Sequence, residues 1–503
     1  MLKPAEPTPV THLPECPRPR EELLTALRSL SGGDADWRRG RVFSLVYDAG
    51  DAHLALLKQA HALYFCENGL NPMAFQSLKR MEAEVVRMAA NLLHGGPDAV
   101  GTMTSGGTES LLMAVKAARD RARKHKPWIR RPELVMPDSA HVGFDKAAHY
   151  FGVKIRRACL GPDFRVDVRS MKRLINRNTV LLVGSAPQYP HGVVDAIEEI
   201  GALGLAKGIP VHVDACVGGF LLPFVEQLGR PVPRWDFRVP GVTSISADLH
   251  KYGYAAKGAS VILYRSMDYL KHQFFVATDW PGGIYASPSM PGTRPGGPIA
   301  AAWAGLQALG VDGYRALTQS ALHSADRLRE GIARIDGLAL LGLPHCTIVT
   351  WGAAAKSHGG AVDVYAVADQ MEQRGWHVDR QQRPACVHLT VMAQHAAVVD
   401  DYLGDLAESV RVVRAHPELR SKGNAAMYGM MAKVPLRFMV GSAVRQVLEG
   451  MYAPGGGAPD LKKPPVGGVV GALLERHGEK VQRALDLVDD ARRQVKDTVG
   501  RYL

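Results

Sequence analysis

The sequence predicts an α/β fold, with a large domain built on a mostly parallel sheet and a smaller C-terminal α/β domain. Between residues 71 and 310, β-branched runs alternate with amphipathic helical segments, a pattern typical of parallel strands joined by helices. From residue 311 to 452, helices mix with shorter strands, which indicates the second domain. A chain of 503 residues is also too long for one ordinary domain.

The expected strands are short runs of β-branched and apolar residues, which are typical of buried strands. They cover residues 134–136, 180–184, 210–213, 242–246 and 260–263 in the large domain, and 347–350 and 386–391 in the small one.

Both ends of the chain are expected to lie outside these two domains. Residues 1–70 combine a Pro-rich leader with a helical segment that begins at Glu21–Leu30. Residues 453–468 are rich in Pro and Gly, as linkers are, and residues 469–502 show helical periodicity. Residues 453–503 are therefore interpreted as a linker and an added C-terminal helix.

The composition, with 46% hydrophobic and 22% charged residues, is typical of a soluble globular protein. The longest apolar stretch, residues 215–225, is too short for stable membrane insertion, since a span takes roughly 20 residues. We expect no signal peptide and, because the six cysteines show no CxxC spacing, free thiols in a cytoplasmic protein. No metal site is expected.

The net charge of +12 does not by itself indicate a nucleic-acid partner. The densest basic run, residues 119–131, is the expected end of a helix, where cations complement the helix dipole. It contains a single aromatic residue, Trp128, whereas a nucleic-acid site would show interleaved aromatics or a known motif. We therefore expect no nucleic-acid binding.

Lys251 is the most informative residue of the chain. It stands in the run Ser246–Gly253, directly after a predicted strand and beside a histidine and a glycine. A lysine amine at the end of a buried strand is energetically costly, so it is expected to have a function. The function that fits is formation of an imine with an aldehyde cofactor. One lysine alone is a weak signal.

Asp214, 37 positions before Lys251, ends another predicted strand. An anion there can hold the pyridine nitrogen of pyridoxal phosphate (PLP) protonated, because an opposite charge favours the charged form. The protonated ring is the electron sink of PLP chemistry. The alternative, an aspartate that caps the next turn, is the commoner role of an isolated Asp in this position.

A Gly-Gly turn, in the run Thr104–Ser110, precedes a predicted helix. Glycines let the backbone approach an anion, and a helix N-terminus offers unpaired N–H groups. Ser105, Thr108 and Ser110 add possible hydroxyl donors. The turn is not a P-loop, since no Gly-Lys-Ser/Thr follows, and Gly-Gly before a helix is more often only a turn. Together with the aspartate and the lysine, however, it predicts a PLP site.

Longer stretches of the chain match a known family. The matching runs are Asn91–Asp98, Thr104–Ser110, Tyr189–Gly192, His212–Cys216, Asp236–Val239, Lys251–Gly258, Phe274–Trp280, Gly283–Pro288 and Arg294–Gly297. On these runs the chain resembles the sphingosine-1-phosphate lyases of the PLP-dependent group II decarboxylase family, from about residue 40 to about residue 452.

The resemblance implies PLP-dependent fold type I, as in aspartate aminotransferase, and a homodimer with shared active sites. It implies PLP as cofactor and a phosphorylated lipid as the small-molecule substrate. The implied reaction is cleavage of the C2–C3 bond of sphingosine 1-phosphate, or of a similar long-chain base phosphate, to a fatty aldehyde and phosphoethanolamine.

The resemblance also assigns residues to the cofactor. Lys251 would hold PLP and is a candidate for the later proton transfers, and the ring of His141 would stack on the cofactor. Gly296 and Gly297 would reach the cofactor phosphate from a second subunit. The full set of expected cofactor contacts is Gly107, Thr108, His141, Asp214, His250, Lys251, Gly296 and Gly297.

On the substrate side, Tyr47, Lys257 and Tyr189 match family positions near the substrate phosphate and hydroxyls. Lys257 supplies a point charge suited to phosphate, although a lysine in such a position is otherwise a surface residue. Tyr428 matches a tyrosine of a C-terminal segment that closes on the site.

Three departures from the family pattern lie near the expected phosphate and substrate positions. Asn71 stands where the family has a histidine, so that a charge-assisted contact becomes a neutral amide. The run Val42–Tyr47, with Leu45, is bulkier than in the family, and Leu249 replaces a threonine. None of them touches the PLP residues.

Two alternatives stay open. A PLP-dependent amino-acid decarboxylase of the wider family would need a cation for the substrate carboxylate, for which Arg294 is a candidate. A catalytically degenerate, dimeric binding protein would keep the fold, but intact Lys251, Asp214 and Gly106-Gly107 argue against it.

Overall fold

The computed structural model describes residues 12–355, 362–433 and 437–454. The described chain divides into two compact units: Phe43–Trp351 with His388–Leu403, and the described parts of Met1–Val42, Gly352–Val387 and Gly404–Leu503. The predicted division at residues 70, 310 and 452 stays a prediction. The predicted C-terminal helix at 469–502, and all but the first two residues of the linker before it, lie outside the described residues.

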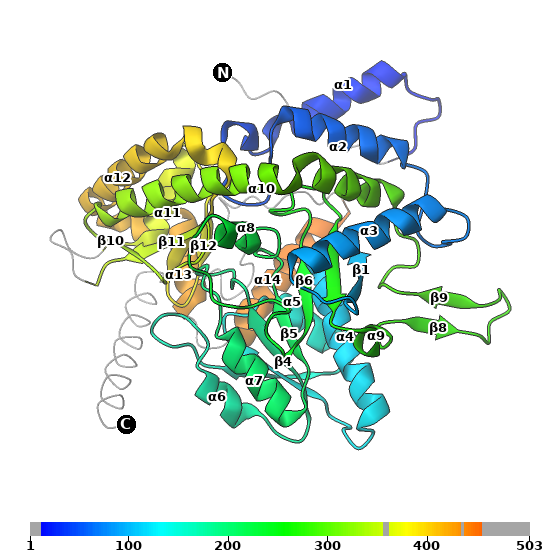
Figure 1. The fold of residues 1–503 in the computed structure, drawn as a ribbon. Coiled ribbons are helices and arrows are strands. Elements are labelled where there is room, and N and C mark those ends of the chain that lie inside the picture. Colours follow the sequence, from blue (N-terminus) through cyan, green and yellow to red (C-terminus); the bar gives the residue numbers. More distant parts are fainter. Residues whose placement is uncertain (1–11, 356–361, 434–436, 455–503) are drawn as a thin grey trace. The chain divides into compact units, whose positions relative to one another are not determined.

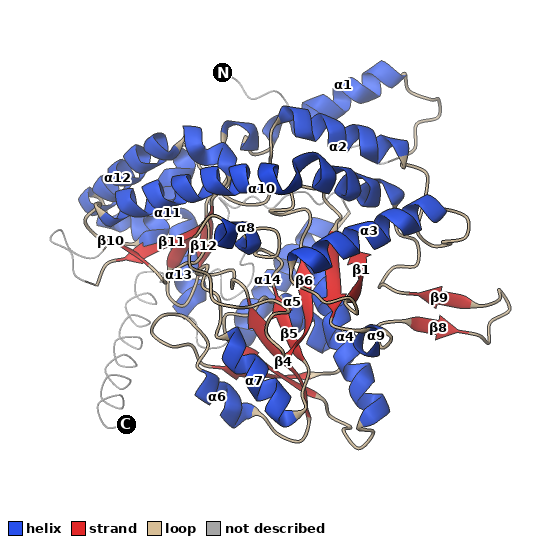
Figure 2. Ribbon diagram, in the orientation of Figure 1, coloured by secondary structure: helices blue, strands red, loops and turns tan. Residues whose placement is uncertain are grey.

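A seven-stranded sheet forms the centre of the larger unit (Figures 1 and 2). Its order is β1-β7-β6-β5-β4-β2-β3, and only β7 runs antiparallel to its neighbours in this sheet. The mostly parallel α/β architecture predicted from the sequence is confirmed. The strands are β1 Val100–Thr104, β2 Glu133–Pro137, β3 Lys154–Ala158, β4 Thr179–Ser185, β5 Val211–Asp214, β6 Val242–Ala247 and β7 Ser260–Tyr264.

All five predicted strands of this sheet are present, whereas β1 and β3 were missed. Strands β2 and β4 to β7 are buried along their whole length, which is why they read as apolar runs. Strands β1 and β3 are the two edges of the sheet. Edge strands tolerate polar residues, and β3 carries a lysine and two arginines.

Helices cover both faces of the sheet. Successive strand residues point to opposite faces, so Val183 packs with α4 and α5 on one face while Leu182 packs with α3, α7, α8 and α10 on the other. The helices of the larger unit are α2 Asp51–Leu63, α3 Gln76–Leu92, α4 Gly107–His125, α5 Gly143–Phe151, α6 Val168–Leu174, α7 Ile197–Lys207, α8 Leu222–Gln227, α9 Met267–Leu270 and α10 Gly296–Ala333. Helix α10 is broken at Gly310, where φ is 54°.

A second sheet has the strand order β10-β11-β13-β12. Its strands β11 and β13 correspond to the two strands predicted near residues 347 and 386, and α1 corresponds to the helix predicted at Glu21–Leu30. The remaining elements are α1 Arg20–Leu30, β10 Leu338–Leu340, β11 Ile348–Ala353, α11 Val364–Gln373, β12 Asp379–Gln381, β13 Cys386–Thr390, α12 Val399–Ala415, α13 Gly423–Lys433 and α14 Arg437–Tyr452.

A hairpin of β8 Phe275–Ala277 and β9 Tyr285–Ser287 extends away from the large sheet (Figure 1). It exposes large apolar side chains, among them Val276, Trp280 and Ile284. None of the described helices combines the length and the apolar content that a membrane span requires.

Candidate active site

The carboxyl ends of six strands, β1 to β6, lie at one edge of the large sheet. Strand β1 points the same way as β6, because both run antiparallel to β7 between them. Residues distant in sequence therefore meet at this edge, where ligands of open α/β sheets bind. The residues carried there are Gly107 and Thr108 after β1, His141 after β2, Tyr189 after β4, Asp214 at the end of β5, and His250 and Lys251 after β6.

Lys251 is paired with Asp248, to which sequence reasoning gave no role. The Nζ of Lys251 lies 2.9 Å from Oδ2 of Asp248, whose side chain is only 1% exposed. Burial lowers the pKa of Lys251, but the carboxylate outweighs burial, so that this pKa is above its ordinary value. Burial raises the pKa of Asp248, and the charge of Lys251 more than reverses that effect. The sequence held one indication of this ion pair, an acidic residue three positions before the lysine.

This ion pair predicts how the apoprotein takes up PLP. Imine formation needs an unprotonated amine, so the rate of PLP uptake should rise with pH from 7 to about 10, the ordinary range of a lysine. The stability of the folded apoprotein should instead stay level over this pH range. A raised Lys pKa and a lowered Asp pKa both stabilise the folded apoprotein between about pH 4 and pH 10, and the stabilisation is lost beyond those limits.

Stopped-flow absorbance of the apoprotein mixed with PLP over this pH range tests the prediction. A rate that is flat or falls with pH would show that the amine is already neutral at pH 7.

The Gly106-Gly107 turn brings the start of α4 against the lysine loop. A Cβ at Gly107 would lie 2.7 and 2.8 Å from the two carboxylate oxygens of Asp248 and 2.9 Å from Sγ of Cys216, so no larger residue fits. The N-terminus of a 19-residue helix thus opens directly beside the amine. Backbone N–H groups in this position suit the phosphate of a cofactor.

Two of the three hydroxyls expected near this turn have partners within the chain. Ser105 donates from Oγ to Glu109 at 2.6 Å. The Oγ of Ser110 is buried between Thr104, at 2.7 Å, and Ser260, at 2.9 Å. The expectation that these two residues bind phosphate is therefore not supported, while the side chain of Thr108 is exposed at the helix start.

His250 is a neutral ring at this edge. Its Nδ1 accepts the N–H of Ala259 at 3.3 Å, which leaves the proton on Nε2. Burial is the main reason that its pKa lies below the ordinary value. A neutral imidazole with one N–H can donate one hydrogen bond, and the contact of His250 with a cofactor phosphate stays a prediction.

Asp214 ends β5 and is buried. Its Oδ1 accepts the backbone N–H of Cys216 at 3.1 Å and the hydroxyl of Ser246 at 3.3 Å. Asp214 therefore does cap the following turn, as the alternative interpretation predicted. This role uses only one of its two carboxylate oxygens. His141 follows β2 in an exposed position, and its Nδ1 accepts the N–H of Gly143 at 3.0 Å.

Lys257, Tyr47 and Leu45 form a second group near Lys251. The Nζ of Lys257 lies 5.2 Å from the centre of the Tyr47 ring and donates to the carbonyl oxygens of Leu45, at 2.5 Å, and His250, at 3.3 Å. Burial and the charge of Lys251 lower the pKa of Lys257. Leu45 has φ 65°, a strained conformation for leucine that aims its carbonyl at the amine.

The other two substrate-side residues have local roles as well. The Oδ1 of Asn71 accepts the N–H of Met73 at 3.0 Å and that of Ala74 at 3.4 Å, which closes a turn. The ring of Tyr189 lies 4.2 Å from the ring of His388. Tyr189 is half-buried and Asn71 is exposed.

Gly296 and Gly297 begin α10 and pack against their own chain. The N–H of Gly296 donates to the carbonyl of Glu67 at 2.8 Å, and a Cβ at Gly297 would lie 2.6 Å from the ring of His61. Within the smaller unit, the ring of Tyr428 lies 5.7 Å from the ring of Tyr365. The roles of these residues at the site stay predictions.

Arg294, the cation considered for a substrate carboxylate, is already paired. It donates to both carboxylate oxygens of Glu82, at 2.5 and 3.2 Å, and the two side chains are 12% and 3% exposed. A buried bidentate pair of this kind does not release its arginine to a ligand without a large penalty.

The site fits pyridoxal phosphate. An amine, a strand-end carboxylate and a glycine turn at a helix N-terminus meet at one sheet edge, and the turn has no room for a side chain at Gly107. In that arrangement Lys251 would hold the aldehyde, Asp214 the ring nitrogen, and the start of α4 with His250 the phosphate.

Comparison with known proteins points the same way. A family model described as the pyridoxal-dependent decarboxylase conserved domain matches residues 12–352. The chain is 44% identical to the sphingosine-1-phosphate lyase of Arabidopsis thaliana over 86% of this chain and 79% of that protein. It is 44% identical to sphingosine-1-phosphate lyase 1 of Rattus norvegicus over 86% of this chain and 75% of that protein.

Solved structures extend the comparison. The sphingosine-1-phosphate lyase of Burkholderia pseudomallei has a TM-score of 0.77 and 39% identity, covering 82% of this chain and 96% of that chain. The glutamate decarboxylase of Lactobacillus brevis has a TM-score of 0.71 and 21% identity, covering 81% of this chain and 96% of that chain, and shows the fold alone. The prediction of fold type I is confirmed.

Proposed function

Because the chain belongs to the pyridoxal-dependent decarboxylase family and, within it, to the sphingosine-1-phosphate lyases, we propose that it cleaves the C2–C3 bond of sphingosine 1-phosphate or a similar long-chain base phosphate. The products are a fatty aldehyde and phosphoethanolamine. The observation that carries the choice of substrate is Lys257, a second amine close enough to Lys251 for the two charges to interact. A second cation beside the cofactor lysine suits a phosphorylated substrate.

Bound PLP supplies the electron sink for the pair of electrons left by the broken bond. Asp214 would hold the ring nitrogen in its charged form, and His141 would offer its ring for stacking on the cofactor. Lys251 would anchor the cofactor, and its amine would also be placed to move protons to and from the substrate. Lys257 holds the substrate phosphate, with Tyr47 and Tyr189 as hydrogen-bond donors on the same side, and Tyr428 closes on the site from its C-terminal segment.

Asn71 offers a direct test of the phosphate side of the site. Asn71→His should lower KM for the phosphorylated substrate by roughly 3- to 10-fold, since a hydrogen bond to a charged group contributes roughly 1 kcal/mol more than one to a neutral group. The gain should grow as pH falls below 7, where the new histidine is protonated. Steady-state kinetics at pH 6 and pH 8 measure it, and an unchanged KM at both pH values would remove position 71 from the phosphate site.

The two alternatives now have less support. The decarboxylase reading needs a cation for a carboxylate, and Arg294 is held in its pair with Glu82. The reading as a degenerate binding protein is wrong, because the chain belongs to a family of enzymes and keeps its cofactor residues.

The homodimer with shared active sites remains part of the proposal. It is supported by the β8–β9 hairpin, which exposes Trp280 and Ile284 in the chain taken alone. Exposed apolar side chains of this size are typical of contact surfaces. The hairpin leads directly to Gly296 and Gly297, the residues expected to reach the neighbouring cofactor.

We propose a cytoplasmic location as well. All six cysteines are free, including three that are buried, as expected for a protein of a reducing compartment.

The function is tested by incubating the purified PLP-loaded protein with sphingosine 1-phosphate and measuring fatty aldehyde and phosphoethanolamine. Both products should form in equal amounts. Non-phosphorylated sphingosine should react far more slowly, and Lys251→Ala serves as the negative control. Release of CO2 from amino acids without aldehyde from the lipid would overturn the proposal in favour of a decarboxylase.

A further inference from the structure

His212 is a buried histidine that the reaction described above does not use. It stands on β5 two residues before Asp214, and the strand register pairs His212 with Ser244 and Asp214 with Ser246 on β6. Side chains two residues apart point to the same face of a sheet, so the four residues form one row. Their exposed fractions are 0% for His212 and Ser246, 4% for Ser244 and 7% for Asp214.

A continuous chain of hydrogen-bond contacts joins this row. The Oγ of Ser244 lies 2.9 Å from Nδ1 of His212, and Nε2 of His212 lies 3.3 Å from Oγ of Ser246. The Oγ of Ser246 lies 3.3 Å from Oδ1 of Asp214. Cys216 flanks the last link, since its Sγ lies 3.3 Å from Ser246 Oγ and its N–H also donates to Asp214.

The protons available in this row fix the direction in which its hydrogen bonds are donated. The Asp214 carboxylate only accepts, so Ser246 donates to it and accepts in turn from Nε2–H of His212. Burial lowers the pKa of His212 to about 4, although Asp214 opposes the shift, so the ring is neutral and carries that single proton. Its Nδ1 then accepts from the hydroxyl of Ser244. Every donor in the row points toward Asp214.

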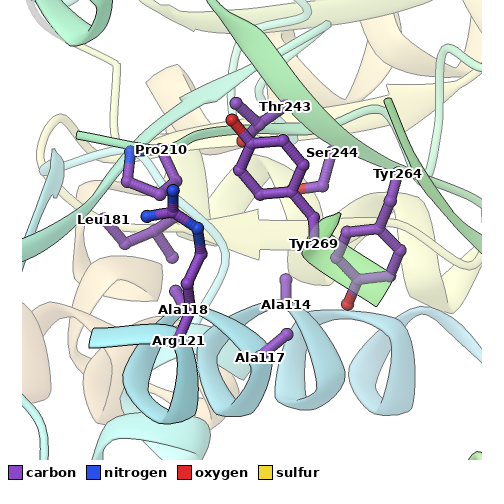
Figure 3. A pocket seen from close by; sticks show the side chains of 10 residues that line it. All are labelled: Ala114, Ala117, Ala118, Arg121, Leu181, Pro210, Thr243, Ser244, Tyr264 and Tyr269. Carbon is purple, nitrogen blue, oxygen red and sulfur yellow. The ribbon is translucent and has the colours of Figure 1, made fainter. Parts of the chain in front are cut away.

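The row begins at a small cavity beside α4 (Figure 3). Ser244 lines this cavity together with Arg121, Pro210 and Tyr269, and its volume is about 10 Å³, roughly what one water molecule needs. Pro210 and Thr243 lie at the starts of β5 and β6, so the cavity is at the opposite end of the strands from Asp214. The row therefore runs along β5 and β6 from this cavity to Asp214 at the carboxyl end of β5.

We propose that His212 and Ser246 are positioning residues that orient the Asp214 carboxylate and keep its negative charge available to the cofactor's ring nitrogen. Hydrogen bonds that end on this carboxylate would favour its ion pair with a protonated ring nitrogen. The inference rests on the PLP cofactor and not on the identity of the substrate. It therefore stands or falls independently of the proposed reaction.

Ser246→Ala tests the proposal, with Thr243→Val as its matched control. Thr243 is also a buried hydroxyl between β5 and β6, but it bonds to the backbone of Val211 and not to the row. The main readout is the ¹⁵N NMR signal of the ring nitrogen in bound, ¹⁵N-labelled PLP. In Ser246→Ala this signal should move toward the unprotonated form, and the dissociation constant of PLP should rise several-fold. In Thr243→Val both should match the parent protein.

Activity should follow the same pattern. In metalloenzymes, residues that hydrogen-bond to a metal-binding side chain affect function by roughly 10- to 100-fold. Ser246 stands in the same relation to Asp214, so we expect kcat to fall by about 10-fold in Ser246→Ala with little change in KM. Ser244→Ala removes the first link only and should produce a smaller change of the same sign in the NMR signal. A ring-nitrogen signal that is unchanged in both serine variants, or that moves equally in Thr243→Val, would overturn the proposal.

Discussion

Lys251→Ala is expected to lower kcat/KM by roughly 1,000-fold or more, because the change removes both the covalent anchor of PLP and a group that transfers protons, and proton transfer alone contributes roughly 10²- to 10⁴-fold. The folded state should persist. The substitution leaves the Asp248 carboxylate buried without its cation, so thermal unfolding of the apoprotein should move to lower temperature without losing cooperativity. Borohydride reduction followed by peptide mapping should label Lys251 in the parent protein and no lysine in the variant.

Lys257→Gln is the matched control for this experiment. It removes the other amine of the same site, so the cofactor should still be reducible onto Lys251 while KM for the phosphorylated substrate rises. If borohydride labels position 257, or any lysine other than Lys251, the assignment of the cofactor lysine is wrong. Activity near the parent level in Lys251→Ala would contradict it equally.

Asp214→Asn should have the next largest effect, a fall in kcat of roughly 10²- to 10³-fold. The amide has nearly the same shape and can still accept the N–H of Cys216, but it carries no charge to hold the ring nitrogen protonated. Loss of one preorganised electrostatic contact to a reacting group costs about this much in other enzymes. Steady-state kinetics measure the loss, and reduction with borohydride should still label Lys251, since the anchor is intact.

Asp214→Glu separates charge from geometry. It keeps the carboxylate but displaces it by one methylene, so part of the activity should return relative to Asp214→Asn. If Asn and Glu variants lose activity equally, position matters more than charge. If Asp214→Asn is fully active, Asp214 is only the turn cap that an isolated strand-end aspartate would be.

Local pattern alone predicted much of the fold and of the cofactor site. Buried strands such as β4 and β5 are apolar along their whole length, so they can be recognised without knowing their neighbours. A loop residue at the end of such a strand must lie at the sheet edge, which is why Asp214 and Lys251 could be assigned to one site. The edge strand β3, with its charged residues, gave no such signal.

Pairing across the fold was not predictable in the same way. The bond of Lys257 to the carbonyl of Leu45 joins residues 212 positions apart, and so does the pair of Arg294 with Glu82. Neither partner carries a local pattern that names the other. The same holds for the contact of the Ser110 hydroxyl with Ser260, which is 150 positions away.

The sequence by itself determined the order of the strands along the chain, the chemistry at their ends and the family to which the chain belongs. The tertiary structure alone decided that Arg294 is already paired with Glu82, which carbonyl oxygen Lys257 contacts, and how His212 connects to Asp214. The physical reason is that strand periodicity and turn chemistry are local properties of the chain, whereas charge pairing and hydrogen-bond direction depend on distances that exist only once β5, β6 and the loops beside them are packed together.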